Sequence, residues 1–156
     1  MCGGYDKSFA AARPILEGMG KKIVHCGGGG AGQAAKICNN MLLGIQMIGT
    51  CEAFALAEKL GLDLQAFYDI SSKSSGQCWS MTSYCPVPGV GPTSPADNDY
   101  QGGFASALML KDLRLAMEAA ADAGSKVEMG ERAKELYEAF AAENGGLDFS
   151  AIIKTL

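Results

Sequence analysis

The chain has 156 residues, of which 48% are hydrophobic and 19% charged, a balance typical of a soluble globular protein with one core. Its formal net charge is −4, its pI is about 5.0, and its basic residues are scattered along the sequence. Binding to nucleic acid or to a membrane surface needs clustered Lys and Arg, so we expect neither partner.

Cysteine and histidine usage argues against a disulfide framework and against a metal site. The chain has six cysteines but no C-x-x-C spacing, and His25 is its single histidine. A helical chain of this length does not need disulfides to fold, and a structural zinc site needs ligands at a closer spacing. We therefore expect reduced thiols and no metal.

The first thirty residues have the pattern of a strand, a helix and a second strand. Residues 1–4 resemble the end of a strand, residues 6–18 have helical apolar spacing, and residues 21–26 resemble a short charged strand. Two strands without a sheet are not stable in water. We therefore interpret residues 1–30 as the remnant of a domain whose remainder is absent from the chain.

A glycine-rich run, Gly27 to Gln33, follows and leads directly into a helix. Glycines 27, 29 and 32 satisfy the G-x-G-x-x-G spacing of dinucleotide-binding loops. A true fingerprint also needs a second strand that ends in an acidic residue, but Glu52, at the expected distance, falls inside a continuous apolar helix. We favour a different interpretation, in which the glycines let the backbone pass between two packed bodies at an interdomain cleft.

From residue 31 onward the pattern predicts an all-α domain. A long helix over residues 31–60 ends at Gly61 and is apolar on most sides, which predicts a buried spine of a helical bundle. Its most apolar stretch, residues 41–50, is interrupted by Gln46 and is too short to span a bilayer. Asp63 is placed to cap a helix over residues 64–72, and further helices are predicted over residues 105–121, 127–142 and 149–156. Between them, residues 73–103 are irregular, and long loops of this kind often carry function.

Lys36 and Asn40 form a candidate chemical pair on the long helix. A spacing of four residues places both side chains on one face. Lys36 is flanked in sequence by Ala34, Ala35, Ile37 and Cys38, which solvate a charge poorly. We therefore expect a partly buried lysine that is suited to proton transfer. Helix propensity does not explain two consecutive asparagines at positions 39 and 40. The pair could therefore move a proton and hold an oxygen.

Several motifs in order resemble the β-hydroxyacid dehydrogenases. They are Gly27-x-x-Gly30-x-Gly32-x-x-x-Lys36-x-x-x-Asn40, Ser74-Ser75-Gly76-x-Cys78-Trp79-Ser80, Tyr84, Pro86-Val87-Pro88-Gly89, Tyr100-Gln101-Gly102-Gly103-Phe104 and Leu108-Met109-x-Lys111-Asp112-Leu113-x-Leu115-Ala116. The resemblance covers the chain up to about residue 140. It implies that residues 1–30 are the end of an NAD-binding Rossmann domain, and that residues 31–156 are an all-α domain for substrate binding and dimerisation.

The resemblance also implies roles for individual residues. Lys36 matches the lysine that takes the hydroxyl proton as hydride leaves the substrate for the cofactor, and Asn40 matches a residue that hydrogen-bonds the substrate. Lys111 matches a lysine near the nicotinamide, with Asp112 as its acidic neighbour in the site. Trp79 and Tyr84 match aromatic residues of the substrate pocket, for which packing alone is the alternative, and Phe104 is placed to cover the nicotinamide.

The branch most resembled oxidises 3-hydroxyisobutyrate with NAD in valine breakdown, in the mitochondrial matrix of eukaryotes and the cytoplasm of bacteria. NADP is the alternative cofactor. Alternative substrates are tartronate semialdehyde, glyoxylate and succinic semialdehyde, and Gln77 and Cys85 depart from the pattern that we expect. A different class of function, a helical dimerisation module without activity of its own, also fits, because the helix over residues 31–60 is apolar around most of its circumference. In either case a homo-oligomer, a dimer or a tetramer, is expected, and the chain alone should be inactive.

Overall fold

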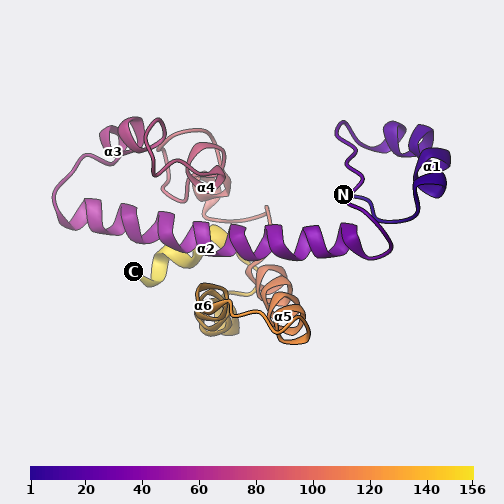
Figure 1. Cartoon of the computed structure of the whole chain (residues 1–156). Helices are drawn as coiled ribbons and strands as arrows, with labels where there is room; N and C mark the ends of the chain where they lie inside the picture. Colours follow the sequence, from indigo (N-terminus) through magenta and orange to yellow (C-terminus); the bar gives the residue numbers. More distant parts are fainter. The chain divides into compact units, whose positions relative to one another are not determined.

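The computed structural model describes all 156 residues and is built from helices (Figure 1). The α-helices are α1 (Asp6–Met19), α2 (Ala31–Lys59), α3 (Leu64–Ser71), α4 (Trp79–Thr82), α5 (Ser106–Asp122) and α6 (Glu128–Asn144), with 3-10 helices η1 (Pro95–Asn98) and η2 (Phe149–Thr155). The prediction of a helical chain is therefore confirmed. The chain divides into two compact units, unit 1 (Met1–Asn40) and unit 2 (Met41–Leu156), which are described separately.

Unit 1 contains the expected helix but not the expected strands. Cys2 and His25 form an isolated parallel bridge, in which the Cys2 N–H donates to the Val24 carbonyl at 2.9 Å and the Cys26 N–H donates to the Cys2 carbonyl at 2.7 Å. So few ladder hydrogen bonds do not make a sheet. The His25 ring stacks on Phe9 at 4.4 Å between ring centroids, and no residue of α1 is buried.

The glycine-rich run allows two stretches of backbone to approach each other within unit 1. Gly27 and Gly30 have φ values of 121° and 84°, which side chains disfavour. A Cβ atom on Gly32 would lie 3.0 Å from the Gly3 nitrogen, and one on Gly3 would lie 2.7 Å from the Gly28 oxygen. Gly3 and Gly32 are therefore required for backbone packing, whereas Gly27 and Gly30 are favoured by their backbone conformation.

Helix α2 ends where the sequence predicts, but its burial differs from the prediction. The Gly61 N–H donates to the Glu58 carbonyl, and Gly61 has a φ of 77°. Only one face of α2 is fully covered in this chain, because its buried residues recur every three or four positions while Leu42 and Leu56 are about half exposed. That face consists of Met47, Thr50, Cys51, Phe54 and Ala57. The expected spine buried on most sides is therefore wrong for the isolated chain.

Helix α2 is also long and apolar enough to cross a membrane by length and composition. It has 29 residues and an 18-residue window of mean hydropathy 1.3, of which 33% is buried inside the chain. The expectation from residues 41–50 that this helix is too short to span a bilayer is therefore wrong by length and composition, because the apolar pattern continues beyond them. The core helix of a soluble protein passes the same test, and Gln46 and Glu52 interrupt the stretch. The test therefore carries little weight.

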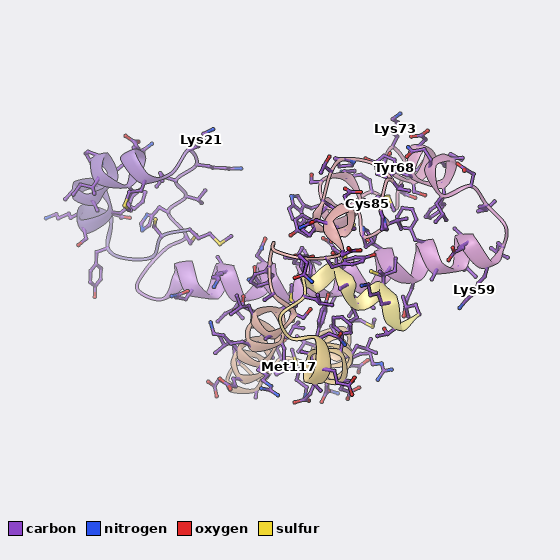
Figure 2. The ribbon with its side chains drawn as sticks, turned by 180° about the vertical axis from the view of Figure 1, so that it is seen from behind. Lys21, Lys59, Tyr68, Lys73, Cys85 and Met117 are labelled. Carbon is purple, nitrogen blue, oxygen red and sulfur yellow. The ribbon has the colours of Figure 1, made fainter.

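Unit 2 packs two hydrophobic clusters around the later part of α2. One cluster lies where α5 and α6 run side by side next to η2 (Figure 1), and it includes Met47, Cys51, Leu113, Tyr137 and Phe149. The other lies beneath α3 and α4 and includes Phe54, Met81 and Cys85. Figure 2 shows Tyr68 and Cys85 in this second region. Because α2 contributes to both clusters, it ties the two halves of unit 2 together.

The irregular segment between α3 and α5 is more ordered than its composition predicts. It contains α4 and η1, and η1 has a capping box formed by Ser94 and Asp97. The Asp97 carboxylate accepts from the Gly89 N–H at 2.7 Å and the Ser94 N–H at 2.9 Å. Asp63 caps α3, as predicted, by accepting from the Ala66 N–H at 2.8 Å.

Candidate functional site

Lys36 and Asn40 lie on one face of α2, as their spacing predicts. The Asn40 side chain is half-buried, and its Oδ1 accepts from the Asn39 Nδ2 at 3.0 Å. Lys36 is exposed, as are Ala34 and Cys38, so the expected partial burial of the lysine is wrong for this chain. Sequence neighbours on a helix point about 100° apart, so they cannot surround one side chain.

Trp79 and Tyr84 lie next to each other in unit 2, in and after the short helix α4. Their rings stack with centroids 4.9 Å apart and an interplanar angle of 22°. Trp79 is 49% exposed, whereas Tyr84 is half-buried. Tyr84 also packs on Phe149, which in turn meets the edge of Phe104 at 5.8 Å. Three predicted site residues, Trp79, Tyr84 and Phe104, are thus joined through Phe149. We call these four residues the aromatic wall.

The wall is anchored by Asp148, which the sequence analysis did not single out. Asp148 is fully buried, and its carboxylate accepts four hydrogen bonds. One of these comes from the Tyr84 hydroxyl at 2.8 Å. Burial, and then the hydrogen bond to Asp148 and its charge, raise the pKa of Tyr84, so its hydroxyl stays protonated.

Asp148 could have been found from sequence only as a helix cap. It follows the Gly145-Gly146 break and precedes an apolar run, which is the usual setting of an N-cap. It does cap η2, since its Oδ1 accepts from the Ser150 N–H at 2.9 Å. Its other oxygen reaches residues 44 and 64 positions earlier in the chain, and local spacing carries no information about such contacts.

Lys111 and Asp112 lie together on α5. The Lys111 Nζ is 3.7 Å from the Asp112 Oδ1, and the two side chains are 61% and 8% exposed. The lysine therefore presents its charge to solvent while the carboxylate faces the interior. An exposed ammonium of this kind is available to an anionic or polar group of a ligand. Lys36 and Asn40 belong to unit 1, whereas Lys111 and Asp112 belong to unit 2.

The cysteines are free thiols, and no group of three or more His, Cys, Asp or Glu residues is arranged to hold a metal. Cys51 and Cys85 are buried, and burial raises the pKa of both thiols. Both are therefore unreactive core residues. Cys85 lies in the cluster beneath α3 and α4, so this departure from the expected pattern affects packing.

With this geometry in place, comparison with known proteins gives a clear result. Residues 30–156 match the family described as NAD-binding of NADP-dependent 3-hydroxyisobutyrate dehydrogenase. The chain belongs to this family. The match covers α2 to η2 and leaves α1 outside. The resemblance seen in the sequence motifs is confirmed.

The chain is similar to several 3-hydroxyisobutyrate dehydrogenases. It is 53% identical to the probable enzyme of Mycobacterium tuberculosis over 156 residues, which are 100% of this chain and 53% of the relative. It is 48% identical to the mitochondrial enzyme of Homo sapiens over 157 residues, which are 100% of this chain and 47% of the relative. The chain thus spans about half the length of the curated relatives that it matches.

Solved structures agree with the fold. The Mycobacterium tuberculosis 3-hydroxyisobutyrate dehydrogenase determined with L-serine superposes with a TM-score of 0.95 at 53% identity, over 98% of this chain and 53% of that one. The Salmonella typhimurium enzyme superposes with a TM-score of 0.83 at 26% identity, over 99% of this chain and 52% of that one. The all-α assignment of residues 31–156 is consistent with these matches.

Proposed function

We propose that this chain forms the C-terminal half of a dehydrogenase that oxidises 3-hydroxyisobutyrate to methylmalonate semialdehyde with NAD, a step of valine breakdown. The family match over residues 30–156 carries the proposal, because it includes Lys36 and Asn40 at their expected spacing. NADP is the alternative cofactor, and the family description names both nucleotides. The division into a Rossmann remnant, residues 1–30, and a substrate-binding domain, residues 31–156, is part of this proposal.

Proton transfer is assigned to Lys36 and oxygen binding to Asn40. When bound, NAD would supply the acceptor for the hydride that leaves the alcohol carbon. The exposed Lys36 amine takes the hydroxyl proton, and the Asn40 amide holds the same oxygen one helical turn away. Lys111, whose side chain is 61% exposed, fits a role at the nicotinamide end of the cofactor, with Phe104 covering the ring and Asp112 beside the substrate.

The substrate class follows from the aromatic wall. The Tyr84 hydroxyl is engaged by Asp148, so Tyr84 and the half-exposed Trp79 offer ring surface to a methyl-bearing 3-hydroxy acid. L-serine, with which the Mycobacterium tuberculosis structure was determined, is also a 3-hydroxy acid. Apolar contacts discriminate by about 1 to 3 kcal/mol per methylene, so tartronate semialdehyde, glyoxylate and succinic semialdehyde remain alternative substrates. Relatives from human and fly are named mitochondrial, and localisation to the matrix in a eukaryote or the cytoplasm in a bacterium stays a prediction.

The decisive experiment uses this chain joined to the N-terminal half of the Mycobacterium tuberculosis relative. Lys36→Ala should lower kcat by about 100-fold or more and leave the KM for NAD nearly unchanged, as expected for loss of a general base. Lys59→Ala, at the other end of the same helix, is the matched control and should change kcat by less than about twofold. A nearly normal kcat in the Lys36→Ala enzyme would contradict the role of Lys36 as the general base. The unjoined chain should show no NAD-dependent turnover.

A second candidate function, a helical oligomerisation module, is supported by an apolar groove between α2 and α6. Its residues are Ile45, Ile48, Gly49, Glu52, Met129, Arg132, Ala133, Leu136 and Leu156. We infer that it binds a second copy of the chain, since Glu52 and Arg132 offer both charges to a self-complementary interface. Sedimentation equilibrium should give dimers or tetramers that Ile48→Arg dissociates, with the control Ile70→Arg, an exposed position on α3, without effect. A monomeric wild-type chain at high concentration would contradict this function.

A further inference from the structure

A single carboxylate oxygen links two residues of the aromatic wall, Tyr84 and Phe104. The Asp148 Oδ2 accepts from the Tyr84 hydroxyl at 2.8 Å and from the Phe104 backbone N–H at 2.7 Å. Resting on the proposed function, we propose that Asp148 is a positioning residue that couples the substrate wall, Trp79 and Tyr84, to the cofactor-side residue Phe104. Asp148 itself is fully buried, so it acts through these residues and touches no ligand.

The chemistry of Asp148 suits this task because every acceptor position is used. Its Oδ1 accepts from the Ser150 N–H at 2.9 Å and from the Ser150 Oγ at 2.6 Å, in addition to the two bonds at Oδ2. A carboxylate offers about four acceptor sites, and these four donors match that number. An asparagine of nearly the same shape would turn an acceptor into a donor. It would then face either Ser150 or the Tyr84 and Phe104 pair with the wrong polarity.

The segment before Phe104 contains four residues with positive φ, and Asp148 contacts the backbone near its start and at its end. Asp99 and Tyr100 have φ values of 49° and 59°, and Gly102 and Gly103 have values of 82° and 66°. The Asp148 N–H donates to the Tyr100 carbonyl at 2.8 Å, which secures the start of this segment. Non-glycine residues rarely adopt such angles unless their surroundings hold them there.

Phe104, at the end of that segment, is hydrogen-bonded through both its backbone N–H and its backbone carbonyl. Its N–H donates to Asp148, and its carbonyl accepts from the Phe149 N–H at 2.8 Å. Gly103 makes this approach possible, because a Cβ atom there would overlap the Asp148 Oδ2 and lie 2.5 Å from the Tyr84 hydroxyl. The strained segment, the wall and η2 therefore meet at one carboxylate.

The coupling makes a specific prediction about which ligand each variant affects. Tyr84→Phe removes the bond between Asp148 and the substrate wall but leaves Phe104 in place. In the joined enzyme it should raise the KM for 3-hydroxyisobutyrate about fivefold or more and leave the KM for NAD unchanged. Asp148→Asn disturbs both partners and should raise both KM values. A purely structural aspartate would instead lower the melting temperature and leave both KM values unchanged below that temperature.

The test has a second readout that does not depend on activity. Trp79 is the single tryptophan and stacks on Tyr84, so its fluorescence reports the position of the wall. In the 156-residue chain, acrylamide quenching of Trp79 should rise by about 1.5-fold or more in Tyr84→Phe as the ring loses its anchor. Tyr68→Phe removes a hydroxyl from another half-buried ring of unit 2 and should leave the quenching unchanged.

The outcomes separate this inference from the proposed function. Unchanged Trp79 quenching in Tyr84→Phe would overturn the positioning role, whatever the enzyme does, and this variant remains informative if Asp148→Asn fails to fold. Changed quenching together with the two KM patterns would support it. Changed quenching in a joined protein without dehydrogenase activity would overturn the proposed function and still leave Asp148 as the anchor of the wall.

Discussion

The two units of the chain hold their candidate site residues in different ways. In unit 1, Lys36 is exposed, no residue of α1 is buried, and the N-terminal segment is paired by one isolated bridge. In unit 2, Tyr84 and Phe104 are fixed by a buried carboxylate and by ring contacts. The difference shows that the part of the proposed site around Tyr84 and Phe104 is preorganised within this chain, whereas Lys36 is not enclosed by it.

The largest expected effect contrasts the cores of the two units. Phe54 is 1% exposed, and its ring meets the Phe67 ring edge-on at 5.0 Å. Phe54→Ala should lower the free energy of unfolding by about 3 to 5 kcal/mol, because it leaves a cavity. Phe9→Ala removes the half-buried ring that stacks on His25 and should cost about 1 kcal/mol. Urea titration followed by circular dichroism measures both, and similar costs would show that unit 1 is as tightly packed as unit 2.

A smaller effect tests whether Asp148 fixes the wall of unit 2 through backbone geometry. Gly102 and Gly103 both have positive φ, but a Cβ atom meets nothing within 4 Å at Gly102 and overlaps Asp148 at Gly103. Gly102→Ala should cost about 1 kcal/mol from the left-handed conformation alone. Gly103→Ala should cost about 3 kcal/mol, because overpacking is added to that strain. If thermal unfolding shows the same loss of stability in both variants, the side chains around Asp148 can move to accommodate the added methyl group.

The helices were predictable from sequence because local signals define them. The apolar period predicted α2 from residue 31, the glycine at position 61 predicted its end, and Asp63 predicted the start of α3. The strands of residues 1–30 were not confirmed, since a strand depends on pairing that the local sequence does not encode. The burial of α2 was overestimated for a similar reason. The apolar composition of α2 indicates that its surface can pack against other parts of a protein, but it does not identify those parts.

The candidate site was predictable only where a motif carried it. Trp79 and Tyr84 were named from the family resemblance, and their stacking is seen in the structure. Asp148 and Phe149 were missed, because their partners lie more than forty positions away along the chain. The exposure of Lys36 does not follow from its apolar sequence neighbours, because adjacent residues on a helix point in different directions. Long-range contacts therefore separate the predicted part of the site from the part that only the structure could show.

The smallest effect concerns the exposed counterpart of Asp148 in unit 2. Hydrogen bonds from the Gly89 and Ser94 backbone N–H groups hold the pKa of Asp97 below its usual range. A depressed pKa means that the carboxylate stabilises the fold above about pH 4, the unfolded value, and that this contribution is lost as pH falls through the lower folded value. Because Asp97 is exposed, the contribution should stay below about 1 kcal/mol.

Asp97→Asn tests this contribution, because it keeps the side-chain shape and removes the titration. The difference in unfolding free energy between wild type and Asp97→Asn should be largest near pH 6 and should shrink by pH 3, as measured by urea titration at each pH. A difference that stays constant with pH would show that the segment around η1 is held by packing and not by the carboxylate charge. In that case the contrast between a buried anchor, Asp148, and an exposed one, Asp97, would no longer describe unit 2.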